Sequence, residues 1–222
     1  MKILLRFADL VLYQNSELRF MLIHIHPQNP QERLVKQVVQ CLRDGGVIVY
    51  PTDTIYGLGC DIMHPKAIER ICRIKNIDPK KAQLSFVCYD LSDLSQYARQ
   101  LTTPVYRKLK GSLPGPYTFI LEASRQVPKI LKTKKDTVGI RIPENEIARA
   151  IVKELGNPIL SASLPGELVE DYTDPDFIHE IFENLLEIVI DGGIGGTEPS
   201  TVIDFTSGEG IVLRQGAGLW EG

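Results

Sequence analysis

The chain has 222 residues, of which 43% are hydrophobic and 24% are charged, and its formal net charge is −3. These values are ordinary for a globular protein, and the length suffices for one large domain or two small ones with a sizeable core. The slightly negative net charge excludes a global basic field that would attract nucleic acid, although a local basic patch stays open.

The four cysteines show no Cys-x-x-Cys spacing and no paired histidines nearby, which argues against a zinc site. They are Cys41, Cys60, Cys72 and Cys88, and we interpret them as buried thiols in a reducing compartment. His24 and His26 would share one face of a strand, as half of a metal site would. Two packed or surface histidines are the favoured interpretation, so no metal site is predicted.

The targeting signals of the chain are weak. No apolar run approaches the ~18 residues that a membrane span needs, and residues 1–20 lack the cationic start and apolar core of a signal peptide. We therefore expect a cytoplasmic protein without a membrane partner. The sequence leaves open whether translation starts at Met1 or Met21. We expect residues 21–222 to form the domain, with residues 1–20 as a candidate N-terminal extension.

Apolar β-branched runs alternate with helical periodicity along the whole chain. In chain order we predict a strand over 22–25, a helix over 30–44, a strand over 47–50, a helix over 65–75, a strand over 84–88, a helix over 104–110, strands over 117–123 and 137–142, a helix over 144–155, a strand over 158–163, a helix from 174 to about 184, and strands over 186–190, 200–205 and 211–214. This order, without a repeat or a linker, predicts a single α/β domain with a mixed sheet. The last two strands are too close for a crossover helix, so we expect them to pair antiparallel.

Several predicted strands end in small polar residues, glycines or an arginine. Ligands of open α/β sheets bind at the carboxyl ends of strands, where hydroxyls, glycine N–H groups and arginines can grip an anion. Each such ending is weak evidence alone because most are only loops. Together they predict a small-molecule cleft.

The clearest ending follows the strand over 47–50. Pro51 would end strand pairing, Thr52, Asp53 and Thr54 would face the cleft, and Gly57 and Gly59 would let the chain turn closely under a ligand. The alternative is a turn whose hydroxyls bond local backbone groups. No Walker A, G-x-G-x-x-G or G-x-S-x-G motif is present.

Five segments, in order, resemble signatures of the YrdC/YciO family, the threonylcarbamoyl-AMP synthase family. They are Tyr50–Gly59, Leu113–Leu121, Thr137–Pro143, Asp191–Asp204 and Val212–Gly216. The resemblance runs from about His24 to Ala217 and implies the YrdC/RibB-like fold, a twisted mixed α/β sheet around a large concave, locally basic cleft.

The resemblance also implies a reaction. The active branch makes threonylcarbamoyl-AMP from L-threonine, bicarbonate and ATP for tRNA modification. Mg²⁺ would arrive with ATP, and no tightly bound cofactor is expected. By the same resemblance, Thr54, Arg141 and Ser200 lie near threonine. The residues placed near ATP are Lys75, Thr118, Ser161, Ser163 and Arg214, with Lys75, Ser161 and Ser163 as the catalytic set.

The chemistry of these residue types agrees with the resemblance. An arginine fork and hydroxyls suit a carboxylate, and lysine and arginine suit phosphates. Positioning and charge stabilisation could supply most of the acceleration, so no protein nucleophile is needed.

Two departures from the active family leave the enzyme assignment open. Its K-x-R motif is Lys75-Asn76-Ile77 here, and its S-x-N motif is Ser161-Ala162-Ser163. Losing a guanidinium that clamps a ligand could cost about 2–4 kcal/mol in the transition state. The altered pattern resembles the YciO branch, as do Asn29–Leu34 and Glu69–Ile74.

Two functions therefore stand side by side: a weak or altered synthase, and a non-catalytic paralogue that holds a nucleotide or RNA, double-stranded RNA included. A purely structural role ranks third. Two basic runs could hold RNA phosphates, although such runs are more often solvated faces. They are Arg70, Arg73, Lys75, Lys80 and Lys81, and Lys129, Lys132, Lys134 and Lys135.

Overall fold

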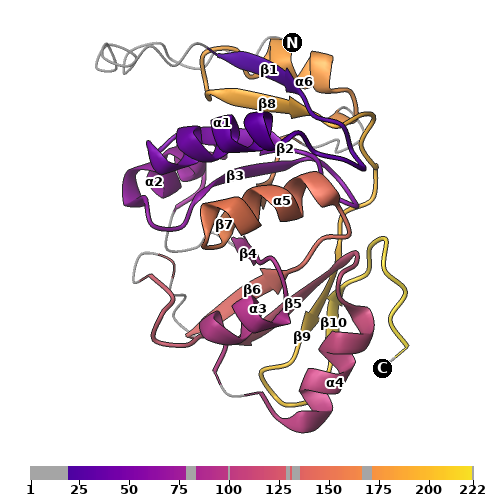
Figure 1. The fold of residues 1–222 in the computed structure, drawn as a ribbon. Coiled ribbons are helices and arrows are strands. Elements are labelled where there is room, and N and C mark those ends of the chain that lie inside the picture. Colours follow the sequence, from indigo (N-terminus) through magenta and orange to yellow (C-terminus); the bar gives the residue numbers. More distant parts are fainter. Residues whose placement is uncertain are drawn as a thin grey trace.

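Strands from the whole chain join in one twisted mixed sheet (Figure 1). The computed structural model describes residues 20–78, 84–99, 101–128, 131, 136–166 and 172–221. The described strands are β1 Met21–His24, β2 Val47–Tyr50, β3 Gly57–Asp61, β4 Ser85–Val87, β5 Tyr117–Glu122, β6 Thr137–Arg141, β7 Ile159–Ser163, β8 Ile188–Asp191, β9 Thr201–Asp204 and β10 Ile211–Arg214. Their order across the sheet is β1-β8-β2-β3-β7-β4-β6-β5-β9-β10. The predicted extension over 1–20 falls, except for its last residue, outside the described residues.

Parallel and antiparallel pairs both occur, which confirms the predicted single α/β domain with a mixed sheet. The parallel pairs are β1–β8, β2–β8, β4–β6 and β5–β9. The antiparallel pairs are β2–β3, β3–β7, β4–β7, β5–β6 and β9–β10. The predicted antiparallel pairing of the last two strands is therefore also confirmed.

Helices connect most of these strands. Those in the described residues are α1 Glu32–Arg43, α2 Pro65–Ile74, α3 Leu91–Tyr97, α4 Thr103–Ser112, α5 Glu146–Leu155 and α6 Pro175–Ile181. Asn145 and Asp174 cap α5 and α6 by accepting backbone N–H groups, and Gly156 ends α5 in a left-handed conformation with φ of 83°. None of these described helices is long and apolar enough to cross a membrane. The cytoplasmic location stays a prediction.

Two elements, β3 and α3, escape prediction from the sequence, and β3 corrects the role expected for two glycines. Gly57 and Gly59 lie within a buried strand paired to β2 and β7. A Cβ at Gly59 would come 2.8 Å from the Tyr50 ring and 2.8 Å from the Ile159 side chain. These glycines make room for the Tyr50 ring, so the expected turn under a ligand is wrong.

The sheet separates two apolar clusters. On one face, strand residues such as Leu58, Phe86 and Phe119 pack with buried residues of α2, α3, α4 and α6. On the other face, Ile48 and Ile188 pack with α1 and α5. Figure 1 shows α1 and α5 side by side over the half of the sheet that holds β2 and β3.

The second face is open over the other half of the sheet. In β9, Thr201 and Ile203 are buried whereas Val202 and Asp204 are partly exposed, and β5 and β6 show related alternation. Alternate residues of a strand point to opposite faces, so this pattern marks one covered and one uncovered face. Among the described helices, only α1 and α5 contribute to the cluster on the second face. We call its uncovered part, over β6, β5, β9 and β10, the open face.

Candidate functional site

Strand pairing brings predicted site residues from distant parts of the chain onto the open face. Phe119 pairs with Ile140, so their neighbours Thr118 and Arg141 lie side by side on the opposite face. Val202 pairs with Thr118 on one side and with Arg214 on the other. Opposite residues of paired strands point to the same face. A row across β6, β5, β9 and β10 therefore carries Arg141, Thr118 and Arg214.

Arg141 joins the loop after β2 in what we call the balanced region: Thr52, Asp53, Thr54 and Arg141. Its Nη2 donates to Asp53 Oδ1 in a short ion pair and to Thr54 Oγ1 at 2.7 Å. The two charged side chains are only 9% and 10% exposed. One positive and one negative charge are therefore held out of water in mutual contact.

Thr118, Ser200 and Arg214 form a second cluster, which we call the cationic region. Thr118 Oγ1 and Ser200 Oγ share a hydrogen bond of 2.8 Å, and Arg214 Nη2 donates to the Ser200 carbonyl at 2.7 Å. Among the described residues no carboxylate forms an ion pair with Arg214. Partial burial, and then the nearby Arg141 charge, lower the pKa of Arg214. Ser200 thus contacts residues predicted for ATP rather than the rest of the threonine set.

Lys75 and Ser163 lie toward the other side of the site. Lys75 Nζ donates to the Ser163 carbonyl at 2.5 Å and to Ser163 Oγ at 3.2 Å. Burial lowers the pKa of Lys75. β7 is two strand spacings from β6 and β10 is three on the other side, so these strands are about 10 and 14 Å from β6. The predicted residues thus spread over a surface large enough for two substrates.

The end of α2 fixes the backbone around Lys75. Asn76 takes a left-handed conformation with φ of 52°, and the Asn76 and Ile77 N–H groups donate to Arg73 and Cys72 carbonyls. These two bonds define a Schellman motif, in which the position of Ile77 is commonly apolar. The Ile77 backbone N–H therefore helps to end α2.

Tyr50 holds Ser161. The Tyr50 hydroxyl donates to Ser161 Oγ at 2.7 Å, and burial raises the pKa of Tyr50 to about 12. Tyr50 therefore stays protonated near neutral pH and directs its proton at Ser161. The Ser161 proton is left available for a ligand.

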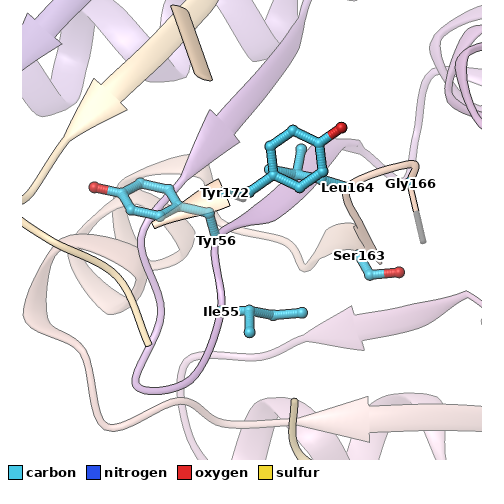
Figure 2. A pocket seen from close by; sticks show the side chains of 6 residues that line it. All are labelled: Ile55, Tyr56, Ser163, Leu164, Gly166 and Tyr172. Atoms are coloured by element: carbon cyan, nitrogen blue, oxygen red, sulfur yellow. The ribbon is translucent and has the colours of Figure 1, made fainter. Parts of the chain in front are cut away.

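A small pocket lies beside this site, between the loop after β2 and the segment after β7 (Figure 2). Its lining is mostly apolar or aromatic: Ile55, Tyr56, Ser163, Leu164, Gly166 and Tyr172. The empty volume is about 230 Å³, part of it open to solvent. Ser163 is the one predicted site residue in this lining, so the large concave cleft stays a prediction.

The other expectations for individual side chains have mixed outcomes. All four cysteines are buried free thiols, as predicted. His24 contacts Asp191, and His26 accepts N–H groups of Gln28 and Asn29. No group of three or more potential metal ligands occurs among the described residues. Arg70 pairs with Glu187 rather than standing free for RNA, while Lys80, Lys81, Lys129, Lys132, Lys134 and Lys135 lie outside the described residues.

Two polar residues of the site were not in the predicted set. Tyr50 appears in the sequence only as part of an apolar strand, although strand alternation could have placed it on the face of Ser161. Asp53 was expected to face the cleft without a role. It lies 88 residues from Arg141 in the chain, and no sequence pattern predicts that the two residues pair.

Comparison with known proteins identifies relatives over most of the chain. Residues 40–216 match the family model Sua5_yciO_yrdC, described as telomere recombination. The uncharacterized protein YciO of Escherichia coli K12 is 44% identical over 198 residues, which cover 88% of this chain and 95% of that protein. A threonylcarbamoyl-AMP synthase of Chromobacterium violaceum is 33% identical over 85% of this chain and 96% of its own length.

Solved structures agree with these matches. The crystal structure of E. coli YciO superimposes with a TM-score of 0.83 and covers 90% of this chain and 97% of that one. Sua5 of P. abyssi, complexed with L-threonine, gives a TM-score of 0.80 at 28% identity. The match covers 88% of this chain but 57% of Sua5, so it concerns one part of that longer protein.

Proposed function

Because the chain belongs to the Sua5/YciO/YrdC family, we propose that it binds L-threonine and Mg-ATP on the open face and joins them with bicarbonate into threonylcarbamoyl-AMP, releasing pyrophosphate and water. The product would serve tRNA threonylcarbamoyladenosine modification. One observation carries the proposal. The same sheet face presents a charge-balanced arginine and, nearby, an arginine without a carboxylate partner among the described residues.

The two regions suit the two substrates. Arg141 and Thr54 offer a guanidinium and a hydroxyl to the threonine head group, which carries a carboxylate. Arg214 and Lys75 bring positive charge to the phosphates, while the hydroxyls of Thr118, Ser161 and Ser163 can donate to phosphate or ribose oxygens. Ser200, which the resemblance implies near threonine, touches Thr118 and Arg214, so this proposal assigns it to the ATP side.

Catalysis of this kind rests on position and charge. The threonine nitrogen, the bicarbonate carbon and the α-phosphorus must come together, and bringing them together can account for much of the acceleration. Lys75 and Arg214 would stabilise the negative charge that develops on the α-phosphate as pyrophosphate leaves. Mg²⁺ enters bound to ATP as part of the substrate.

A direct assay tests the proposal. The protein is incubated with L-threonine, bicarbonate and Mg-ATP, and pyrophosphate is followed over time. We expect release that depends on all three substrates and that falls about 100-fold in Lys75→Ala, because one preorganised charge is worth about 2.7–4 kcal/mol. Release no faster than in Lys75→Ala would remove the synthase assignment.

A repair experiment tests the two departures from the active family. Ile77→Arg with Ser163→Asn should raise turnover 30- to 1000-fold if it restores about 2–4 kcal/mol of transition-state stabilisation. Ile77→Gln with Ser163→Asn is the matched control, since it removes the same apolar side chain from the end of α2 without adding charge. Equal rates in the two double mutants would show that the site has diverged elsewhere.

Ile77 also favours a second candidate, a paralogue that binds ATP without this reaction. The Ile77 side chain brings no charge to the position where the resemblance implies an arginine, and its backbone N–H takes part in ending α2. In that case ATP at 100 times its Kd would still stabilise the fold by about 2.7 kcal/mol. ATP-dependent melting together with absent pyrophosphate release identifies the binder, and a flat melting temperature excludes both candidates.

Binding of RNA in place of ATP has less support. Arg70 is paired with Glu187, and Lys75 contacts Ser163. RNA held by phosphate contacts would lose affinity steeply with added salt. Retention of a tRNA or of a double-stranded RNA at low salt that is lost at high salt would support this role.

A further inference from the structure

The Asp53–Arg141 pair has a buried polar atom without a hydrogen-bond partner on each side. Asp53 Oδ2 and Arg141 Nε are both buried, and neither has a hydrogen-bond partner among the described residues. Of the other atoms, Arg141 Nη2 reaches Asp53 Oδ1 and Thr54 Oγ1. Buried polar atoms without partners are costly and rare. An acceptor and a donor, both unfilled, therefore stand in one ion pair.

The loop holds Asp53 in a defined place before any ligand arrives. Thr52 Oγ1 accepts the Thr54 N–H at 3.1 Å and donates to the Ile55 carbonyl at 2.7 Å. The Gly196 N–H donates to the Thr54 carbonyl at 2.8 Å. These bonds fix the backbone on both sides of Asp53, so little ordering is left to be done on binding.

The two unpartnered atoms require ligand groups of opposite kind, one acceptor and one donor. Arg141 Nε needs an acceptor such as a carboxylate, and Asp53 Oδ2 needs a donor such as an ammonium. Phosphate and bicarbonate would satisfy the arginine but place negative charge against the aspartate. An α-amino acid carries carboxylate and ammonium on one carbon, so its zwitterionic head group matches both.

We propose that Asp53 receives the α-ammonium of the amino-acid substrate while Arg141 holds its carboxylate, so that the balanced region selects a zwitterion and rejects simple anions. This inference deepens the proposed function and rests on it for the identity of the amino acid. Asp53 is then a specificity residue as well as the counterion of Arg141. As a counterion alone, it would affect folding but not discriminate between ligands with and without an amine.

Binding of three matched ligands, measured by calorimetry without ATP, tests the inference. They are L-threonine, (2S,3R)-2,3-dihydroxybutanoate, in which a hydroxyl replaces the ammonium, and L-threonine amide, in which the carboxylate is gone. We expect the wild type to bind L-threonine at least tenfold more tightly than either analogue. In Asp53→Asn the preference over the dihydroxy acid should fall to threefold or less.

Asp204→Asn is the control variant, because it removes another carboxylate from the open face, in β9. Its preference for the amine should equal that of the wild type. Equal binding of L-threonine and the dihydroxy acid by the wild type would overturn the inference, as would full discrimination in Asp53→Asn. The wild-type comparison decides the matter even if Asp53→Asn does not fold.

The inference and the proposed function can fail separately. If threonine does not bind but another L-amino acid does, with the same dependence on its amine and on Asp53, the threonine reaction is wrong and the inference stands. If pyrophosphate release requires L-threonine yet Asp53→Asn keeps full amine discrimination, the function stands and the inference is wrong. Absence of binding by every L-amino acid tested at millimolar concentration overturns the inference.

Discussion

Arg141 and Arg214 lie on one face of one sheet, yet their surroundings differ. Arg141 is 8% exposed and paired with a buried carboxylate. Arg214 is exposed, and its described bonds go to neutral oxygens of Ser200. Because an arginine keeps its charge in almost any setting, the counterion beside it decides which ligands it can take.

The difference assigns the two regions to different chemistry. A ligand reaching Arg141 meets an internal charge pair and must offer both signs to satisfy it. A ligand reaching Arg214 meets positive charge that also repels the neighbouring Arg141, so added negative charge relieves it. We therefore expect changes in the balanced region to affect stability and amino-acid binding, and changes in the cationic region to affect ATP binding.

The largest contrast should appear in folding stability. Arg141→Met leaves the Asp53 carboxylate buried without its partner, which should lower the free energy of unfolding by about 3–5 kcal/mol. Arg214→Met removes an exposed side chain with no carboxylate partner among the described residues and should cost less than about 1 kcal/mol. Urea unfolding of both variants measures the difference.

A compensating change checks the cause. Asp53→Leu combined with Arg141→Met removes both charges, and replacing a buried pair by apolar residues is often neutral. Most of the lost stability should therefore return in the double variant. If it is no more stable than Arg141→Met, the buried charge of Asp53 is not the source of the loss.

Two glycines offer the next contrast, because each supports one region. A Cβ at Gly196 would overlap the Thr54 carbonyl oxygen, and a Cβ at Gly216 would overlap the Pro199 carbonyl oxygen next to Ser200. Overpacking of this kind costs about 1–3 kcal/mol. Gly196→Ala should weaken L-threonine binding about tenfold, and Gly216→Ala should weaken ATP binding by a similar factor.

Each of these variants is the control for the other, because both add one methyl group to a loop near the site. If the two regions are distinct, titrations should show that Gly196→Ala mainly weakens L-threonine binding and that Gly216→Ala mainly weakens ATP binding. Equal loss of both ligands in both variants would mean that the two regions behave as one.

A smaller effect is expected at Tyr50, whose hydroxyl donates a hydrogen bond to Ser161. Tyr50→Phe removes the hydrogen bond to Ser161 and should cost about 1 kcal/mol of stability. If Ser161 serves ATP, its loosened hydroxyl should lower ATP affinity about fivefold and leave L-threonine affinity unchanged. Unfolding and calorimetry on this variant, with Tyr97→Phe as a control in the opposite cluster, separate the two effects.

Much of the architecture follows from local sequence patterns. The apolar runs predict β2 and β8, and the helical pattern over 144–155 that ends at Gly156 predicts α5. The strand β3 escapes because its sequence, Gly-Leu-Gly-Cys-Asp, contains two glycines that ordinarily weaken a strand. Its strand conformation depends on contacts with other parts of the chain. β3 pairs with β2 and β7, and the Tyr50 ring packs against its two glycines.

The candidate site divides in the same way. Hydroxyls and arginines at the ends of predicted strands can be identified from the sequence alone. Strand pairing then brings them together on the open face. The pairing of Asp53 with Arg141 and of Tyr50 with Ser161 joins residues 88 and 111 positions apart. Such pairs depend on sheet order and register, which a single sequence does not specify. Their chemical consequences therefore emerge only from the structure.

The smallest expected effect concerns pH and distinguishes Lys75 from the arginines. Burial disfavours the charged ammonium, so the pKa of Lys75 lies below its usual value of 10.5 in the ligand-free protein. As the pH rises through that lowered pKa, Lys75 loses its proton and must regain it to bind phosphate. ATP affinity should therefore fall several-fold as the pH rises above that lowered pKa.

Lys75→Arg is the matched control, because a guanidinium keeps its charge throughout this range. Its ATP affinity should stay level where that of the wild type declines, as measured by calorimetry from pH 7.5 to 10. L-threonine itself loses a proton in this range, so the comparison is made with ATP alone. An identical decline in both proteins would place the titrating group elsewhere and remove Lys75 from the phosphate contacts.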